Sequence, residues 1–203
     1  MKLLALDSSG LVASVAILDG ETLVAEYTLN YKKTHSQTLL PMLDEIVKMT
    51  QTELSEMDAI AVAAGPGSFT GLRIGSATAK GLGLALNKPI ISVPTLEGIA
   101  CNFYGTDAII CPMMDARRQQ VYTGIYTFVN GEMQIIQKQC AISVEELAGR
   151  LKEEYEKYWD DISPFIKFGC LKDTKFCEKM SDYVLFKNLD DKYLTFKECL
   201  EEN

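Results

Sequence analysis

Residues 63–75 of this chain are Ala63-Ala64-Gly65-Pro66-Gly67-Ser68-Phe69-Thr70-Gly71-Leu72-Arg73-Ile74-Gly75, a glycine-rich turn. The turn joins an apolar run of buried-strand length to a segment with helical periodicity. Such a turn directs backbone N–H groups and the positive end of a helix dipole at one point, which suits a phosphate. Gly65, Gly67 and Ser68 are therefore candidate phosphate-binding residues. A tight corner with Ser68 or Thr70 as the helix N-cap explains the turn equally well.

The segments around this turn predict an α/β fold. Three antiparallel strands come first, and the Asp19-Gly20 pair between the second and third is a type I′ hairpin signal. Helix-linked strands follow, which favours a mixed five-stranded sheet flanked by helices. The expected ranges are strands at 2–7, 12–18, 22–29, 58–64 and 89–93 and helices at 36–49 and 69–86.

The second half of the chain starts like the first. Residues 108–111, 120–128 and 133–141 predict three more strands, and a helix with Glu146 at the capping-box position is expected from Ser143. Charged residues are denser beyond this point. We expect an N-terminal lobe over residues 1–100 and a degenerate, smaller or truncated lobe over residues 101–203.

The predicted helix at 69–86 has a stripe with almost no side chains. Glycine inside a helix costs about 0.5–1 kcal/mol relative to alanine, so a close approach by another backbone is expected to compensate. The approaching element is the chain's own helix or sheet, or a helix of a partner. We favour both, with the 36–49 helix completing a paired docking face. The predicted interface residues are Leu39, Leu43, Ile46, Gly71, Gly75, Ala79 and Gly83.

A second turn, Asp7-Ser8-Ser9-Gly10, follows the first predicted strand. Asp7 is either a strand-terminating aspartate or a magnesium-holding residue, with Ser8 and Ser9 beside the phosphates of a nucleotide. The equivalent turn of the second lobe carries Arg117 and Arg118 where small glycines are needed. Arg117 is a candidate phosphate ligand, yet the complete set of turns makes a poor ATP site.

Composition excludes several classes of function. The net charge of −8 over 203 residues disfavours binding to nucleic acid by this chain alone. The six cysteines contain no C-x-x-C pair, so we expect no zinc knuckle and no metal site. His35, the single histidine, rules out an H-x-x-x-H pair and is expected to cap or pack. No signal peptide or membrane span is predicted, and we expect a cytoplasmic protein.

The motifs resemble those of the TsaB (YeaZ) family of bacterial tRNA threonylcarbamoyladenosine biosynthesis proteins. The resemblance covers about residues 1–128 and weakens from Ser143 onward. It rests on Leu4-Ala5-Leu6-Asp7-Ser8-Ser9, His35-Ser36, Leu39-Leu40-Pro41, the glycine-rich turn through Gly75, Ala79-Lys80-Gly81-Leu82, Met114-Asp115-Ala116-Arg117-Arg118 and Val121-Tyr122.

This resemblance implies a two-lobed ASKHA fold (actin-like, RNase H-like) and a non-catalytic scaffold role without catalytic residues of its own. The implied partners are a TsaD-like catalytic paralogue and a TsaE-like ATPase, with a homodimer when the chain is alone and tRNA reached only through the complex. No cofactor is required, although weak ATP or ADP binding is compatible with the turns. The alternative is an ASKHA-type phosphotransferase or ATPase with its own nucleotide site.

Overall fold

The computed structural model describes residues 1–31, 34–106, 108–147, 149–150, 185–187 and 193–195. The chain divides into two compact units, Met1–Gly98 and Ile99–Asn203. This division lies two residues before the lobe boundary expected from the sequence. Each unit is described by itself.

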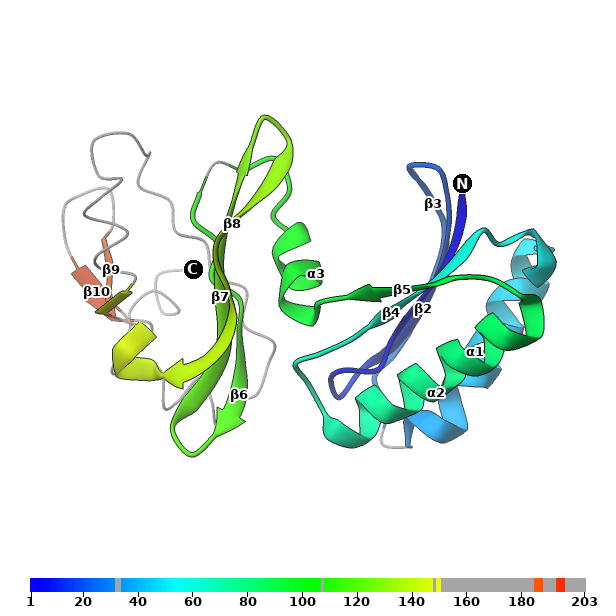
Figure 1. The fold of residues 1–203 in the computed structure, drawn as a ribbon, viewed down its shortest axis with the longest axis horizontal. Helices are drawn as coiled ribbons and strands as arrows, with labels where there is room; N and C mark the ends of the chain where they lie inside the picture. The colour runs from blue at the N-terminus through cyan, green and yellow to red at the C-terminus, as the bar shows by residue number, and fades with distance from the viewer. Residues whose placement is uncertain (32–33, 107, 148, 151–184, 188–192, 196–203) are drawn as a thin grey trace. The chain divides into compact units, whose positions relative to one another are not determined.

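The first unit contains a five-stranded mixed sheet (Figure 1), which confirms the fold class predicted from the sequence. The strand order is β3-β2-β1-β4-β5. β2 pairs antiparallel with both β1 and β3, whereas β4 pairs parallel with both β1 and β5. The strands are β1 (Lys2–Asp7), β2 (Ala13–Asp19), β3 (Thr22–Leu29), β4 (Ala59–Ala63) and β5 (Ile90–Val93).

Two long helices, α1 (His35–Thr50) and α2 (Phe69–Leu86), pack on the sheet, and a 3-10 turn, η1 (Leu54–Glu56), precedes β4. Ser68 caps α2, because its side-chain oxygen accepts a hydrogen bond from the Gly71 N–H at 3.2 Å. Of the two predicted N-cap residues, Ser68 is therefore the cap. The short helix α3 (Thr95–Cys101) follows β5.

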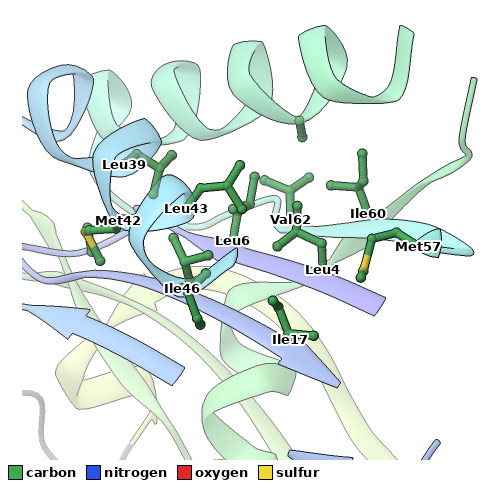
Figure 2. Close-up of a cluster of buried hydrophobic side chains, with 13 residues drawn as sticks. Leu4, Leu6, Ile17, Leu39, Met42, Leu43, Ile46, Met57, Ile60 and Val62 are labelled. Carbon is green, nitrogen blue, oxygen red and sulfur yellow. The ribbon is translucent and has the colours of Figure 1, made fainter. Parts of the chain in front are cut away.

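The hydrophobic core of this unit lies between α1, α2 and the sheet (Figure 2). Leu39, Leu43 and Ile46 of α1 are 1%, 4% and 4% exposed and belong to this core. They pack with the inward side chains of β1 and β2, which alternate along each strand. The prediction that these three residues meet a partner is wrong, because the chain's own sheet covers them.

The second unit contains an antiparallel sheet of order β6-β7-β8 and a two-stranded sheet of β9 and β10. The prediction of a strand at residues 108–111 is wrong. Pro112 has no N–H to donate, and only Ile110 bridges to β7, at Tyr126. The strands are β6 (Met113–Arg117), β7 (Gln120–Val129), β8 (Glu132–Ser143), β9 (Leu185–Lys187) and β10 (Tyr193–Thr195).

A helical turn at residues 144–147 follows β8. The Glu146 N–H donates a hydrogen bond of 3.1 Å to the Ser143 hydroxyl, which is one half of the predicted capping box, and the Glu146 carboxylate accepts a hydrogen bond from Arg150 at 2.6 Å. Part of the chain for which a smaller or truncated lobe was expected, residues 151–184, 188–192 and 196–203, lies outside the described residues.

Candidate functional site

The site predicted from the sequence is formed by two segments of the first unit, which we name the serine turn (residues 7–10) and the glycine loop (residues 65–71). In the serine turn, an Asp7 carboxylate oxygen accepts a hydrogen bond from the Ser9 N–H at 2.8 Å. Asp7 is exposed, whereas Ser8 and Ser9 are buried. The turn therefore fixes Asp7 at the surface and directs its serines into the unit.

The serine turn and the glycine loop are in direct contact. The Ser68 N–H donates a hydrogen bond of 2.6 Å to the Ser9 carbonyl oxygen. The Ser8 hydroxyl donates another, of 2.9 Å, to the Gly71 carbonyl oxygen. A Cβ atom at Gly67 would collide with the Ser9 backbone, so glycine is required there for the approach. These two hydrogen bonds and the close backbone approach hold the serine turn against the glycine loop.

This contact changes the interpretation of the glycine loop. A phosphate cradle needs backbone N–H groups that are free to bind an anion. The Ser68 N–H is bonded to Ser9, the Gly71 N–H to the Ser68 hydroxyl, and the Gly65 N–H to the Thr95 hydroxyl at 3.1 Å. The structure therefore corrects the expectation of an open phosphate cradle at Gly65, Gly67 and Ser68. The serine turn packs against Gly67 and Gly71 of the loop instead.

The small-residue stripe of α2 faces the chain's own sheet. A Cβ atom at Gly71 would collide with the Ser8 carbonyl oxygen, and one at Gly75 would lie 2.5 Å from the Ser8 hydroxyl oxygen. Ala79 is fully buried in the core. At Gly83 a Cβ atom would lie 3.0 Å from Ile90 of β5. The prediction that this stripe meets a partner helix is wrong, and its intramolecular alternative is correct.

His35 takes part in the same packing. It is the first residue of α1, and its Nε2 lies 2.9 Å from the Gly10 carbonyl oxygen. Because a carbonyl can only accept, Nε2 is the protonated nitrogen. Its ring also borders the position that a Cβ at Gly71 would occupy, at 3.3 Å. His35 therefore ties α1 to the serine turn, as the packing interpretation of this residue predicted.

The outer faces of α1 and α2 carry apolar side chains that the sequence analysis did not single out. Leu84 is 87% exposed and Phe69 is 69% exposed on α2, while Leu40 and Met49 are exposed on α1. The Arg73 guanidinium lies 3.9 Å from the centre of the Phe69 ring, a cation–π contact. These residues lie outside the buried stripes of the two helices. The helical spacing of the buried residues was the sequence signal that could have identified them as exposed.

Arg117 lies in the second unit, where β6 meets β7 in a tight hairpin. Arg117, Arg118 and Gln119 all have left-handed backbone conformations, with φ of 63°, 52° and 61°. Each left-handed residue other than glycine costs about 1–2 kcal/mol. An Asp115 carboxylate oxygen accepts a hydrogen bond from the Arg117 N–H at 2.7 Å and supports the turn.

Among the described cysteines, Cys111 of the second unit is buried. Burial raises its pKa from 9.0 to about 11, and the contact of its sulfur with the Thr123 hydroxyl, at 3.2 Å, offsets part of this effect. A thiol protonated this firmly is a poor nucleophile. Among the described residues, no three His, Cys, Asp or Glu side chains gather as a metal site would require. In the same part of the chain, no helix is long and apolar enough to span a membrane.

Comparison with known proteins gives a consistent result. The model of the family TsaD, tRNA N6-adenosine threonylcarbamoyltransferase, matches residues 22–180. The chain is 37% identical to the tRNA threonylcarbamoyladenosine biosynthesis protein TsaB of Bacillus subtilis (strain 168) over 154 residues, which are 76% of this chain and 67% of that protein. Identity to the TsaB of Escherichia coli (strain K12) is 36% over 128 residues, or 62% of this chain and 55% of the relative.

The solved structure of YeaZ from Pseudomonas aeruginosa matches with a TM-score of 0.63 and 34% sequence identity. The match covers 71% of this chain and 68% of that one. Over that part of its length, the chain is therefore similar to YeaZ in both sequence and fold.

Proposed function

Because this chain belongs to the TsaB (YeaZ) family of tRNA threonylcarbamoyladenosine biosynthesis proteins, we propose that it is a non-catalytic subunit of the threonylcarbamoyl-transfer complex. That complex forms N6-threonylcarbamoyladenosine next to the anticodon of tRNAs that read codons beginning with A. In this proposal a TsaD-like paralogue carries the catalysis, a TsaE-like ATPase assists, and the chain forms a homodimer when alone. The complex works in the cytoplasm.

The observation that carries this proposal is the closure of the glycine loop onto the serine turn. Three of the N–H donors in the loop are bonded within the chain. The single histidine is bonded to the Gly10 carbonyl oxygen. Ser8, Ser9 and Ser68, which the alternative would place beside the phosphates of a nucleotide, are used here to hold the end of β1 and the start of α2 together. This use supports a scaffold more than a phosphotransferase.

The outer faces of α1 and α2 supply the surface for such a role. Leu40 and Met49 on α1 and Phe69 and Leu84 on α2 are exposed apolar side chains on neighbouring helices (Figure 1). Removing exposed apolar side chains from water favours association with another protein. We therefore place the contact with the TsaD-like subunit on these outer faces, opposite the buried stripes.

Co-expression with the TsaD-like subunit of the same organism tests the proposal. We expect the two chains to elute together in size-exclusion chromatography, and modification of tRNA in vitro to require both chains. ATP turnover by the isolated chain, abolished by Asp7→Asn, would instead support the phosphotransferase. Separate elution of the two chains over a range of concentrations would contradict the scaffold role.

A further inference from the structure

The hairpin between β6 and β7 departs from the turn chemistry used in the rest of the described chain. Arg118 and Gln119 occupy its two central positions, both with positive φ, as a type I′ turn requires. The β2–β3 turn has Gly20 in the left-handed region, and the β7–β8 turn has Asn130 and Gly131 there. Those two turns use the residues that tolerate this conformation best.

The β6–β7 turn therefore has Arg118 and Gln119 at positions where glycine or asparagine would be more stable. Glycine at position 118 or 119 would remove backbone strain without removing any contact that the described structure provides. Strained conformations that persist in place of an easier residue are concentrated at functional sites. The strain points to a use for the arginine side chains beyond forming the turn.

The described residues provide no such use. Arg117, Arg118 and Gln119 are exposed. No described carboxylate forms an ion pair with either guanidinium, whereas Arg150 pairs with Glu146 at 2.6 Å. The Asp115 carboxylate bonds to the backbone N–H of Arg117 and so fixes the turn. Within the part of the chain that the structure describes, the tip therefore presents two adjacent cations that form no ion pair.

We propose that Arg117 and Arg118 contact backbone phosphates of the tRNA in the assembled complex. This inference rests on the proposed function, which supplies an RNA substrate. Guanidinium groups donate to phosphate oxygens in a planar, two-pronged geometry. A chain of net charge −8 repels a polyanion over most of its surface, so it can contact RNA only where basic side chains are clustered. The tip is such a point and contacts the RNA backbone without reading its sequence.

The test uses the purified complex of this chain with the TsaD-like subunit and a fluorescently labelled tRNA anticodon stem-loop. Binding is followed by anisotropy between 50 and 200 mM salt. We expect Arg117→Ala and Arg118→Gly each to raise the Kd on the order of tenfold. The slope of log affinity against log salt should become shallower by about 0.7–0.9 for each lost phosphate contact.

Gln119→Gly is the matched control. It removes the same kind of strain as Arg118→Gly but keeps both arginines. We expect both glycine variants to raise the melting temperature by about 2–4 °C, while only Arg118→Gly weakens RNA binding. A stability gain accompanied by a binding loss separates use of the side chain from a structural role of the turn.

The remaining outcomes are distinguishable. Unchanged RNA affinity and salt slope in both arginine variants, with the complex intact, would overturn the inference and leave the proposed function standing. Weaker assembly of the subunits with unchanged RNA affinity of the assembled complex would also overturn it and would assign the tip to an acidic protein surface. Failure of the unaltered chain to join the TsaD-like subunit would overturn the proposed function and this inference with it.

Discussion

The Ser8 hydroxyl donates a hydrogen bond of 2.9 Å to the Gly71 carbonyl oxygen, in the interior of the first unit. This bond joins the end of β1 to the first turn of α2. The same contact explains two of the glycines of α2: the Ser8 carbonyl oxygen occupies the space that a side chain at Gly71 would need, and the Ser8 hydroxyl occupies the space beside Gly75. The cost of the helical glycines is offset by packing within the chain.

Gly71→Ala is expected to destabilise the protein by about 2–3 kcal/mol, because the added methyl group would overlap the Ser8 carbonyl oxygen. Gly81→Ala is the matched control on the same helix, since nothing lies within 4 Å of a Cβ atom at Gly81. We expect that variant to be more stable by about 0.5–1 kcal/mol. Urea denaturation measures both changes, and equal effects would contradict the assignment of the stripe to the sheet.

Gly75→Ala and Ser8→Ala are expected to compensate each other in part. The methyl group at position 75 would lie 2.5 Å from the Ser8 hydroxyl oxygen, whereas the Ser8 Cβ is 3.8 Å away, an ordinary contact distance. Removing the hydroxyl therefore relieves the overlap. We expect the double variant to be more stable than the sum of the single effects by about 1 kcal/mol or more. Strict additivity in a double-mutant cycle would show that the two sites do not touch.

Leu84→Asp is expected to weaken assembly with the TsaD-like subunit by at least about tenfold while changing the free energy of unfolding by no more than about 0.5 kcal/mol. Leu84 is exposed on the outer face of α2. Leu23→Asp makes the same chemical change at an exposed position of β3 and should leave assembly intact. Isothermal titration calorimetry measures both affinities. Equal losses in the two variants would remove the outer helix face from the interface.

Leu43→Ala probes the opposite face of α1. Leu43 is 4% exposed and lies in the core, so its truncation should cost about 2–5 kcal/mol of stability. At temperatures where the variant is still folded, assembly with the TsaD-like subunit should be unchanged. Thermal denaturation and calorimetry separate the two effects. Normal stability with lost assembly would restore the original prediction that this residue belongs to the interface.

The buried thiol of Cys111 predicts a loss of stability in alkali. Its pKa is raised to about 11 in the folded chain, whereas an exposed thiol ionises near 9. Between these values the unfolded chain releases the proton and the folded chain keeps it. Stability from this group is therefore complete below about pH 9 and falls by about 1.4 kcal/mol per pH unit up to about pH 11.

Cys111→Ala should be less stable than the unaltered chain at pH 8, because a buried side chain is truncated. Its stability should nevertheless fall less steeply between pH 9 and pH 11. Urea denaturation at four pH values in this window compares the slopes. Identical slopes would show that Cys111 titrates alike in the folded and unfolded chains.

The sequence was sufficient to predict the elements around the glycine loop, because each carries a local signal. Ser68 caps its helix three residues before Gly71. The hairpin expected at Asp19-Gly20 is also present, but its turn is shifted by one residue: Asp19 ends β2 and pairs with Thr22, and Gly20 is the residue with positive φ. The sequence did not predict which part of the molecule the small-residue stripe of α2 packs against. Glycines at four-residue spacing indicate a close approach but do not identify the approaching backbone. Only the fold shows that it is the serine turn, about sixty residues earlier in the chain.

The prediction of a strand at residues 108–111 was wrong because the apolar pattern did not show which residues pair with β7. Ala108, Ile109, Ile110 and Cys111 are all buried, so the apolar pattern was genuine. Burial alone does not produce strand pairing. Pro112 interrupts the pairing with β7 between the single Ile110–Tyr126 bridge and the Met113–Thr123 pair. The more polar residues 113–117 form the edge strand instead. Arg117 shows the same limit, since a left-handed arginine has no signature in composition or periodicity.

The bond between Ser8 and Gly71 also sets an order of events during protein synthesis. The two residues are 63 positions apart, so the ribosome adds Gly71 roughly 3–13 s after Ser8 at a translation rate of about 5–20 residues per second. For most of that interval, from the end of β3 at Leu29 until β4 (Ala59–Ala63) is added, the β1–β2–β3 meander has no β4 to pair with, and the free edge of β1 is available to other strands. The nascent chain is therefore most prone to associate with its neighbours on the same message before β4 has been made.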